Sequence, residues 1–340
     1  MSESKEVAWI DRLIAGFKSP ENRLNKPHES DSELISLPGN KHLLAVSTDT
    51  IFEEIQSGLY RDPFQIGWMT VTVNVSDLAA VGASPVGILL SEGIPKTLDP
   101  DFIERMQEGI ARASEVYGIP ILGGDTNQTN ELYMGGTALG HIEDACYMKR
   151  SGCKPGDSLF TTAKAGIGSC CSFSLINNSY ECTYLPKARV QEGMMIRNYS
   201  DACIDTSDGL IAGIDQLIRS SKIGIDLQVS PRDILCEDAL AISERYNLPD
   251  WIFLNGPHGD FELLFSVSGE KTDEFKAYAG SNKLEVIYLG KVLENQGLFV
   301  NGDESCDTGL LRNLFDDAGG DPEKYLKKLL KTDSPWKMKH

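Results

Sequence analysis

The sequence predicts an α/β protein, with some α+β character, that folds as two domains in one chain. Its 340 residues exceed what one compact core usually holds. Short apolar runs of strand length alternate with longer segments in which apolar residues recur at helical spacing. The segment KRSGCKPGD at 149–157 has the glycine, proline and charge content of a linker. We therefore expect domains at 1–148 and 149–312, followed by a tail at 313–340.

The first half should alternate between strands and buried helices. The apolar run at 68–81 predicts a buried helix, because Gly82-Ala83-Ser84-Pro85 stops it and its length exceeds that of a strand. Asn74 and Asp77 are three residues apart, so they should share one helix face. The other expected elements are helices at 9–17 and 100–117, and strands at 42–46, 86–90, 119–122 and 132–141, of which 119–122 should be short, buried and ended by Gly-Gly-Asp-Thr.

The second half repeats this alternation. A glycine-rich turn at Gly166-Ile167-Gly168 should open a helix within 165–176. The loop 255–260 should separate two apolar segments, 251–254 and 261–267. In the tail, Tyr325, Leu326, Leu329 and Leu330 predict an amphipathic helix. We also expect strands at 158–162 and 202–204 and a helix at 210–218.

Composition excludes some classes of function. The formal net charge of -18 argues against a nucleic-acid partner, which would need a basic face. The acidic surplus has two readings, namely solubility or carboxylates gathered to hold cations. The first residues lack the apolar core of a signal peptide, and no segment reaches the roughly 18 apolar residues of a membrane span. We expect a cytoplasmic protein with no membrane partner.

Aspartates interrupt or follow the apolar runs. For any one of them, capping or turn formation is a sufficient explanation, and Asp208 before Gly209 could be only a helix cap. As a set, with Ser, Thr and Asn beside them, they favour oxygen-rich sites for magnesium. Magnesium in turn bridges nucleotide phosphates during phosphoryl transfer. The aspartates are Asp31, Asp49, Asp77, Asp125, Asp205 and Asp208.

A cation for phosphate is the other expected component. The chain has no GxxxxGK[ST] loop, so phosphate binding must depend on metal and on a few basic side chains. Arg150 is the best candidate, because its guanidinium can form a fork to phosphate oxygens. The alternative is an exposed linker charge.

Five motifs resemble the thiamine-monophosphate kinase family. They are STDTIFEE at 47–54, GWMTVTVNVSDLAAVGASP at 67–85, ILGGDTNQ at 121–128, KRSGCKPGD at 149–157 and IDTSDGL at 204–210. The wider superfamily also holds aminoimidazole ribonucleotide synthetase and selenophosphate synthetase. The resemblance implies an N-terminal mixed sheet that forms a dimeric barrel with helices outside, and a C-terminal α/β sandwich domain. It also implies a homodimer, ATP bound with several magnesium ions, and transfer of the γ-phosphoryl group to a small molecule.

The same resemblance assigns roles to residues. Its expected metal ligands are Asp31, Ser47, Thr48, Asp49, Asp77, Asp125, Asp205 and Asp208, with Thr48 acting through its carbonyl. The nucleotide contacts would be Gly124, Asp125, Arg150 and Ser207. Asp49, Asp125 and Asp208 are the expected catalytic residues.

The chain departs from the family mainly on the acceptor side. One carboxylate of the first metal loop is replaced by Ser30, the substrate-side histidine is Gln56, and a glutamate is replaced by Gly259, which follows His258. Aromatic residues that could replace the family's aromatic ending are Phe315, Tyr325 and Trp336. We therefore expect ATP- and magnesium-dependent phosphoryl transfer to a small acceptor, such as another phosphorylated or carboxylated metabolite, through an altered pocket at Gln56, His258 and Gly259. The alternatives are an authentic thiamine-monophosphate kinase and a degenerate nucleotide-binding protein.

Overall fold

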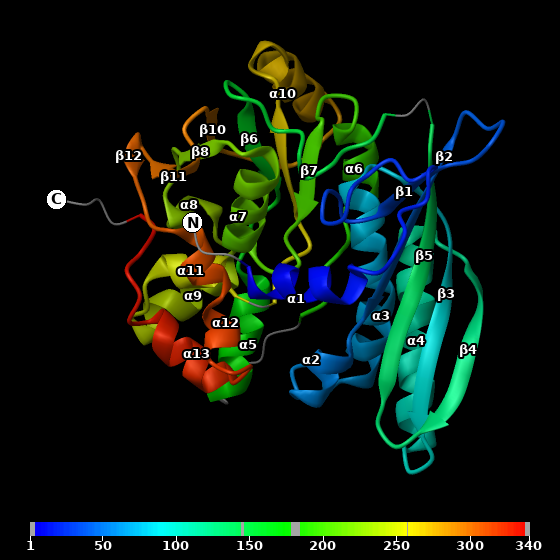
Figure 1. Cartoon of the computed structure of the whole chain (residues 1–340). Coiled ribbons are helices and arrows are strands. Elements are labelled where there is room, and N and C mark those ends of the chain that lie inside the picture. Colours follow the sequence, from blue (N-terminus) through cyan, green and yellow to red (C-terminus); the bar gives the residue numbers. More distant parts are fainter. Residues whose placement is uncertain (1–3, 144–145, 178–183, 257, 337–340) are drawn as a thin grey trace.

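The computed structural model describes residues 4–143, 146–177, 184–256 and 258–336. Its elements form two β-sheets with helices packed around them, which confirms the predicted α/β class (Figure 1). The segment at 149–157 lies between the last strand of the first sheet and the first strand of the second. None of the helices in these ranges combines the length and apolar composition needed to cross a bilayer.

The first sheet has five strands in the order β1-β2-β5-β3-β4. Neighbouring strands are antiparallel except β3 and β4, which are parallel and joined by helix α4. The strands are β1 (Glu33–Ser36), β2 (Leu43–Thr50), β3 (Ser84–Pro95), β4 (Ile121–Thr129) and β5 (Tyr133–Ile142). The helices of this half are α1 (Lys5–Ile14), α2 (Phe52–Gln56), α3 (Pro63–Ala80) and α4 (Pro100–Tyr117).

The second sheet has seven strands in the order β12-β11-β8-β10-β6-β9-β7. These are β6 (Ser158–Thr162), β7 (Ala202–Asp205), β8 (Gly224–Leu227), β9 (Leu263–Val267), β10 (Val286–Leu293), β11 (Gly297–Val300) and β12 (Asp303–Glu304). Its helices are α5 (Ile167–Asn177), α6 (Val190–Ile196), α7 (Leu210–Ser221), α8 (Pro231–Ile234), α9 (Glu237–Tyr246), α10 (Thr272–Ser281), α11 (Thr308–Arg312), α12 (Leu314–Asp317) and α13 (Pro322–Leu329), with short 3₁₀ turns at η1 (Asp250–Leu254) and η2 (Gly269–Lys271).

Helix α3 packs against elements of both sheets. It is apolar on most sides because it contacts β2, β5 and α4 in the first half and α6 and β7 in the second. Asp62 caps its N-terminus by accepting the backbone N–H of Gln65, and Pro63 occupies the first turn. The contact between α3 and β7 brings the ends of two distant motifs together.

Strand β4 corrects one expectation. The sequence predicted a short buried strand ended by Gly123-Gly124, but β4 continues through both glycines to Thr129, and all of it is exposed. A Cβ on Gly124 would lie 2.2 Å from the Leu90 carbonyl oxygen, so glycine permits the close pairing with β3 rather than ending the strand. Strand β2 likewise extends past the predicted 42–46 to include Ser47-Thr48-Asp49-Thr50.

Candidate active site

The polar face of α3 holds the end of β2. The Asn74 side-chain oxygen accepts the backbone N–H of Asp49 at 2.9 Å, and its amide group donates to the Asp49 carbonyl at 3.3 Å. One turn along, Asp77 accepts a hydrogen bond from the Ser47 hydroxyl. Asn74 and Asp77 therefore share a face, as their spacing predicts, and that face fixes the backbone around Asp49.

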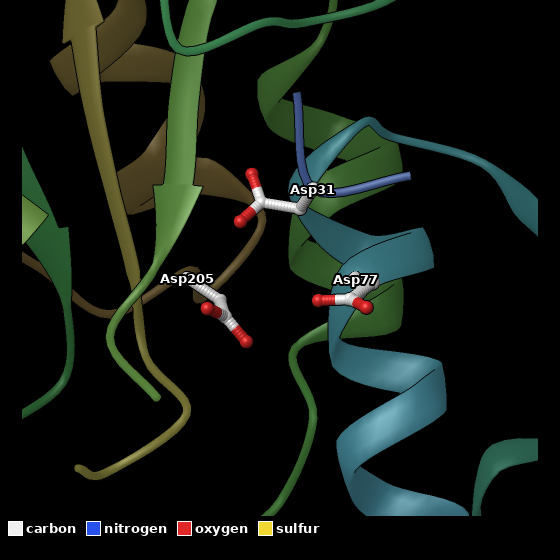
Figure 2. A group of neighbouring side chains, drawn as sticks. All are labelled: Asp31, Asp77 and Asp205. Carbon is white, nitrogen blue, oxygen red and sulfur yellow. The ribbon is translucent and has the colours of Figure 1, made fainter. Parts of the chain in front are cut away.

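Three carboxylates converge where α3 meets β7. Oxygen atoms of Asp31, Asp77 and Asp205 all lie within 4.8 Å of one another, and Figure 2 shows the side chains pointing into a common space. Asp31 comes from the loop before β1, Asp77 from α3 and Asp205 from the end of β7. We call this group the carboxylate cluster.

The cluster carries more negative charge than its surroundings balance. Burial raises the pKa of Asp77 well above its usual value, and the neighbouring charges of Asp205 and Asp31 raise it further. Burial also raises the pKa of Asp31 to about 6, although the charge of Arg150 opposes the change. A bound cation would remove this cost, because it favours the ionised carboxylates.

Arg150 is the cation nearest to the cluster. Its guanidinium donates to Asp31 at 2.8 Å and to the Gln216 side chain at 2.9 Å, and its backbone N–H donates to the Glu29 carbonyl at 2.8 Å. The side chain is only 19% exposed, so the alternative of an exposed linker charge is wrong. Lys149 and Ser151 also bond to Glu29, which ties the 29–31 loop to the segment that follows the first sheet.

The donor set fits a hard divalent cation. It consists of carboxylate oxygens, which magnesium prefers. The second oxygen of Asp31 is buried and has no hydrogen-bond partner among the described residues. A buried, unsatisfied carboxylate oxygen is costly unless an ion completes its environment.

The loop after β7 completes one side of the cluster. Asp205 accepts hydrogen bonds from the Ser76 hydroxyl at 2.5 Å and from the Ser207 hydroxyl at 2.7 Å. Asp208 does not cap α7, since Gly209 holds that position without a side-chain bond. Asp208 instead lines two clefts, where partial burial and then the charge of Glu6 raise its pKa to about 6 against the opposing charge of Arg312.

The other expected metal residues lie around the cluster or away from it. Thr48 uses its hydroxyl within the sheet, donating to the Gly136 carbonyl at 2.8 Å. Asp49 at the end of β2 keeps part of its surface in contact with solvent. Neighbouring groups nevertheless surround its carboxyl, and this desolvation raises its pKa to about 6. Asp125, beside Gly124, lies on the edge strand β4, three strands from β2, which corresponds to about 14 Å. The structure therefore does not bring Asp125 to the cluster.

Asp208 lines one of two adjoining cavities. The larger, which we call the mouth cleft, has a volume of about 640 Å³ and includes Glu53, Glu54 and Asp208. The smaller, the apolar cavity, measures about 130 Å³ and is walled mainly by Phe173, Ile252, Phe253, Leu326 and Leu329. The two cavities adjoin, because both are lined by Ser57, Asn255, Gly256, His258, Phe315 and Tyr325.

The expected acceptor residues fall in different places. His258 lines both cavities, and burial lowers its pKa to about 4. Gln56 is exposed at the end of α2 and lines neither cavity. Gly259 packs against the loop after β7, because its N–H donates to the Ser207 carbonyl at 2.7 Å and a Cβ there would lie 1.5 Å from the Thr206 oxygen. Its backbone position leaves no room for a side chain.

Several cavity residues were not assigned by the sequence. Glu54 faces Asp49 and Asp208, and burial, reinforced by those charges, raises its pKa to about 7. Its only signal was the second glutamate of the STDTIFEE motif. Of the aromatic candidates, Phe315 and Tyr325 line the cavities, whereas Trp336 donates to the Val229 carbonyl at 2.8 Å and lines neither cavity.

Comparisons with known proteins agree with this arrangement. Residues 29–142 match the AIR synthase related protein, N-terminal domain. The chain is 31% identical over 279 residues to the thiamine-monophosphate kinase of Buchnera aphidicola subsp. Schizaphis graminum, covering 78% of this chain and 84% of that protein. It is 30% identical over 334 residues to the thiamine-monophosphate kinase of Methanocaldococcus jannaschii, covering 92% of this chain and 99% of that protein. The chain belongs to the thiamine-monophosphate kinase family.

Membership of the thiamine-monophosphate kinase family makes the chain a phosphotransferase of the kinase type. The fold is shared with AaThiL, whose structure was solved in complex with AMPPCP and TMP. The TM-score is 0.74 at 24% sequence identity, and the match covers 89% of this chain and 96% of that one.

Proposed function

We propose that this kinase uses ATP and magnesium, and that the carboxylate cluster is its metal site. The observation that carries the proposal is the convergence of Asp31, Asp77 and Asp205 within 4.8 Å, with one buried Asp31 oxygen that has no hydrogen-bond partner in the described part of the chain. The structure of AaThiL with AMPPCP, an ATP analogue, supports a nucleotide in this fold. Magnesium bound here would neutralise charge on the phosphates during transfer.

The chain's own residues would position the reactants. Asp31, Asp77 and Asp205 would hold the metal from three separate segments, with Ser47 and Ser76 fixing the last two carboxylates. Arg150 is held by Asp31 and Gln216, and its unpaired Nε atom is buried nearby. In this proposal Asp49, Asp208 and the Thr48 carbonyl face the transferred group, which Arg150 and Ser207 help to orient.

We propose that a second copy of the chain covers β4. The strand is exposed throughout, including Ile121 at 40% and Leu122 at 51%, and its outer edge is unpaired among the described residues. Pairing there would continue the first sheet into a barrel shared by two chains, and would place Gly124 and Asp125 at the interface. Leu122→Glu should convert a dimer to a monomer in analytical ultracentrifugation. A wild-type monomer at all concentrations would contradict the proposal.

The acceptor is proposed to be a small phosphorylated molecule bound in the mouth cleft and apolar cavity. Its pocket differs from the family pattern at Gly259, where there is no space for a side chain, whereas the other altered position, Gln56, lines neither cavity. Thiamine monophosphate itself is the second candidate, since the named relatives are thiamine-monophosphate kinases at about this chain's full length.

One assay separates these candidates. Purified protein with ATP and magnesium is offered thiamine monophosphate, and thiamine diphosphate and ADP are measured by liquid chromatography. We expect magnesium-dependent ADP formation with some phosphorylated acceptor and weak turnover of thiamine monophosphate. Turnover at a rate typical of kinases, about 1–100 per second, would refute the altered pocket. ATP binding without turnover on any acceptor would instead support a degenerate binding protein.

A further inference from the structure

Arg312 is a nearly buried arginine that faces the clefts around Asp208. It is the last residue of α11, and its side chain is only 9% exposed. It nevertheless lines the mouth cleft and also a second cleft of about 700 Å³. We call the second space the arginine cleft, because Arg150 and Arg312 both line it together with Asp208. A guanidinium placed there has restricted motion and limited access to water.

A buried aspartate holds Arg312 in place. Asp215 on α7 has a fully buried side chain, and an Arg312 nitrogen lies 3.8 Å from its carboxylate. The same carboxylate accepts shorter bonds of 2.6 Å from Arg219 and from the Thr308 hydroxyl. Asp215 thus has two stronger donors, and it restrains Arg312 without engaging its whole hydrogen-bonding edge.

The terminal nitrogen of Arg312 that does not face Asp215 contacts a carboxylate from the N-terminal helix. Its other terminal nitrogen lies 3.3 Å from Glu6 on α1, which is 57% exposed. Helix α1 crosses between α11 and α12 on one side and the β1 region on the other (Figure 1). It buries none of its residues, and its other ion pairs are Lys5–Asp317 and Asp11–His28. The backbone N–H of Lys5 also donates to the Asn313 side chain at 3.4 Å, and Val7 and Ile10 are half-buried. A short helix with no fully buried residue and with ion pairs made by its exposed side chains is weakly attached.

Glu6 lies among other acidic side chains. Its carboxylate is close enough to Asp49 and Asp208 to raise the pKa of each. The ion pair with Arg312 opposes the repulsion between these carboxylates. Phosphate oxygens are also acceptors for an arginine fork, and they would bring magnesium to balance the aspartates.

We propose that Arg312 binds a phosphate group of a substrate and that Glu6 of α1 occupies this position until the phosphate displaces it. The inference rests on the proposed phosphotransfer function and deepens it. It assigns to this kinase a phosphate contact from the C-terminal part of the chain, outside the five motifs. The phosphate belongs either to the nucleotide or to the acceptor, and both present the same oxygens.

The chain provides a matched control for this proposal. Arg219 donates to the same Asp215 carboxylate that forms an ion pair with Arg312, but Arg219 lines neither the mouth cleft nor the arginine cleft. If Arg312 only neutralises Asp215, then Arg219→Gln and Arg312→Gln should behave alike. If it binds phosphate, only Arg312→Gln should weaken the ligand.

The test is isothermal titration calorimetry of the full chain with magnesium and AMPPCP, and then with thiamine monophosphate added to the nucleotide complex. Arg312→Gln should weaken at least one of the two ligands tenfold or more, and Arg312→Lys should recover part of the loss. Arg219→Gln should change affinity less than twofold, although it lowers the melting temperature. Glu6→Gln should tighten the affected ligand at least threefold, because the competing charge is gone.

The outcomes separate the two proposals. A wild-type protein that binds no magnesium–AMPPCP would refute the proposed function itself. Normal nucleotide binding by the wild type, with Arg312→Gln binding both ligands equally well, would overturn only the role of Arg312. If Arg312→Gln loses affinity for only one of the two ligands, the nucleotide or thiamine monophosphate, that ligand carries the phosphate that Arg312 contacts. If the wild type binds the nucleotide alone, the nucleotide titration decides the proposal.

Discussion

The carboxylate cluster and the apolar cavity are built from different kinds of contact. In the cluster, each aspartate is fixed by a named partner, as Asp31 is by Arg150, Asp77 by Ser47 and Asp205 by Ser76. The apolar cavity is walled mainly by apolar side chains from α5, η1, α12 and α13, and the Asn255–Tyr325 hydrogen bonds lie at its edge with the mouth cleft. Polar contacts require particular residues, whereas apolar walls accept many side chains of similar volume.

This difference explains why the residues of the carboxylate cluster could be predicted from the sequence, whereas most walls of the apolar cavity could not. Exchanging any cluster residue leaves a buried charge or donor without its partner, so the surrounding motif is tightly constrained. A cavity wall can change shape while the core remains packed, and acceptor specificity can change with it. The predictions below test each side of this comparison.

Asp205→Asn should have the largest effect on activity. It removes one charge from the cluster. The asparagine oxygen can accept from one of the Ser76 and Ser207 hydroxyls, and its NH₂ group can donate to the other, so we expect a folded protein with magnesium-dependent turnover reduced by roughly 10²–10³-fold. The control is Asp226→Asn, a buried aspartate that bonds to Gln228 and the Gly302 N–H. Steady-state kinetics should show little change for the control. Equal losses in both variants would mean that the cluster is only structural.

Gly259→Ala should have the largest effect on stability. Its Cβ would lie 1.5 Å from the Thr206 oxygen and 2.6 Å from the Gly209 nitrogen, so the loop bearing Asp208 must move. We expect the free energy of unfolding in urea to fall by roughly 3–5 kcal/mol. Gly280→Ala, in a helix where nothing lies within 4 Å, should instead stabilise by about 0.5–1 kcal/mol. A stable Gly259→Ala protein would show that a family-like glutamate could be accommodated.

Sequence patterns predicted α4 and β6 with their observed bounds, whereas α3 begins five residues before the predicted 68–81 and α1 four residues before the predicted 9–17. Helix α4 has the predicted bounds, and α3 presents Asn74 and Asp77 together because helical spacing is a local property. The sequence predicts that Gly123-Gly124 ends strand β4, but the strand continues through both glycines. Gly124 is needed because the Leu90 backbone lies too close for a side chain. That contact depends on strand pairing, which a single sequence does not reveal.

His258 tests the electrostatics of the acceptor side. Burial lowers its folded pKa to about 4 from 6.5, so the folded state binds this proton less tightly than the unfolded chain. Stability from this residue is therefore present above pH 6.5 and is lost as pH falls toward 4. Between pH 7 and pH 5 the free energy of unfolding should fall by about 1–2 kcal/mol because of His258, and this contribution should be absent in His258→Asn. Urea unfolding at pH 7, 6 and 5 measures this difference, and parallel curves for the two proteins would show that His258 is solvated.

The residues that sequence analysis missed share one property, which is distance along the chain. Arg312 pairs with Glu6, which lies 306 residues earlier in the chain, and Arg312 lies in none of the five motifs. Glu54 faces Asp208, and neither residue's neighbours indicate the other. The cluster aspartates are also far apart in the chain, but Asp77 and Asp205 lie in two of the five motifs, and Asp31 lies in the loop that resembles the family's first metal loop. Long-range contacts were predictable only where the family resemblance supplied the motif.

Gln56→His should have the smallest effect. Restoring the family's histidine changes an exposed side chain that lines neither cavity, so kcat/KM for thiamine monophosphate should change less than about twofold.

Two residues away, Glu54 lines the mouth cleft, and Glu54→Gln should raise KM for the acceptor by about tenfold through loss of a charged contact. Comparing these two α2 variants asks which face of the helix meets the acceptor. A large gain from Gln56→His with no effect of Glu54→Gln would mean that α2 rotates when substrate binds, and that the acceptor side is less altered than its static geometry indicates.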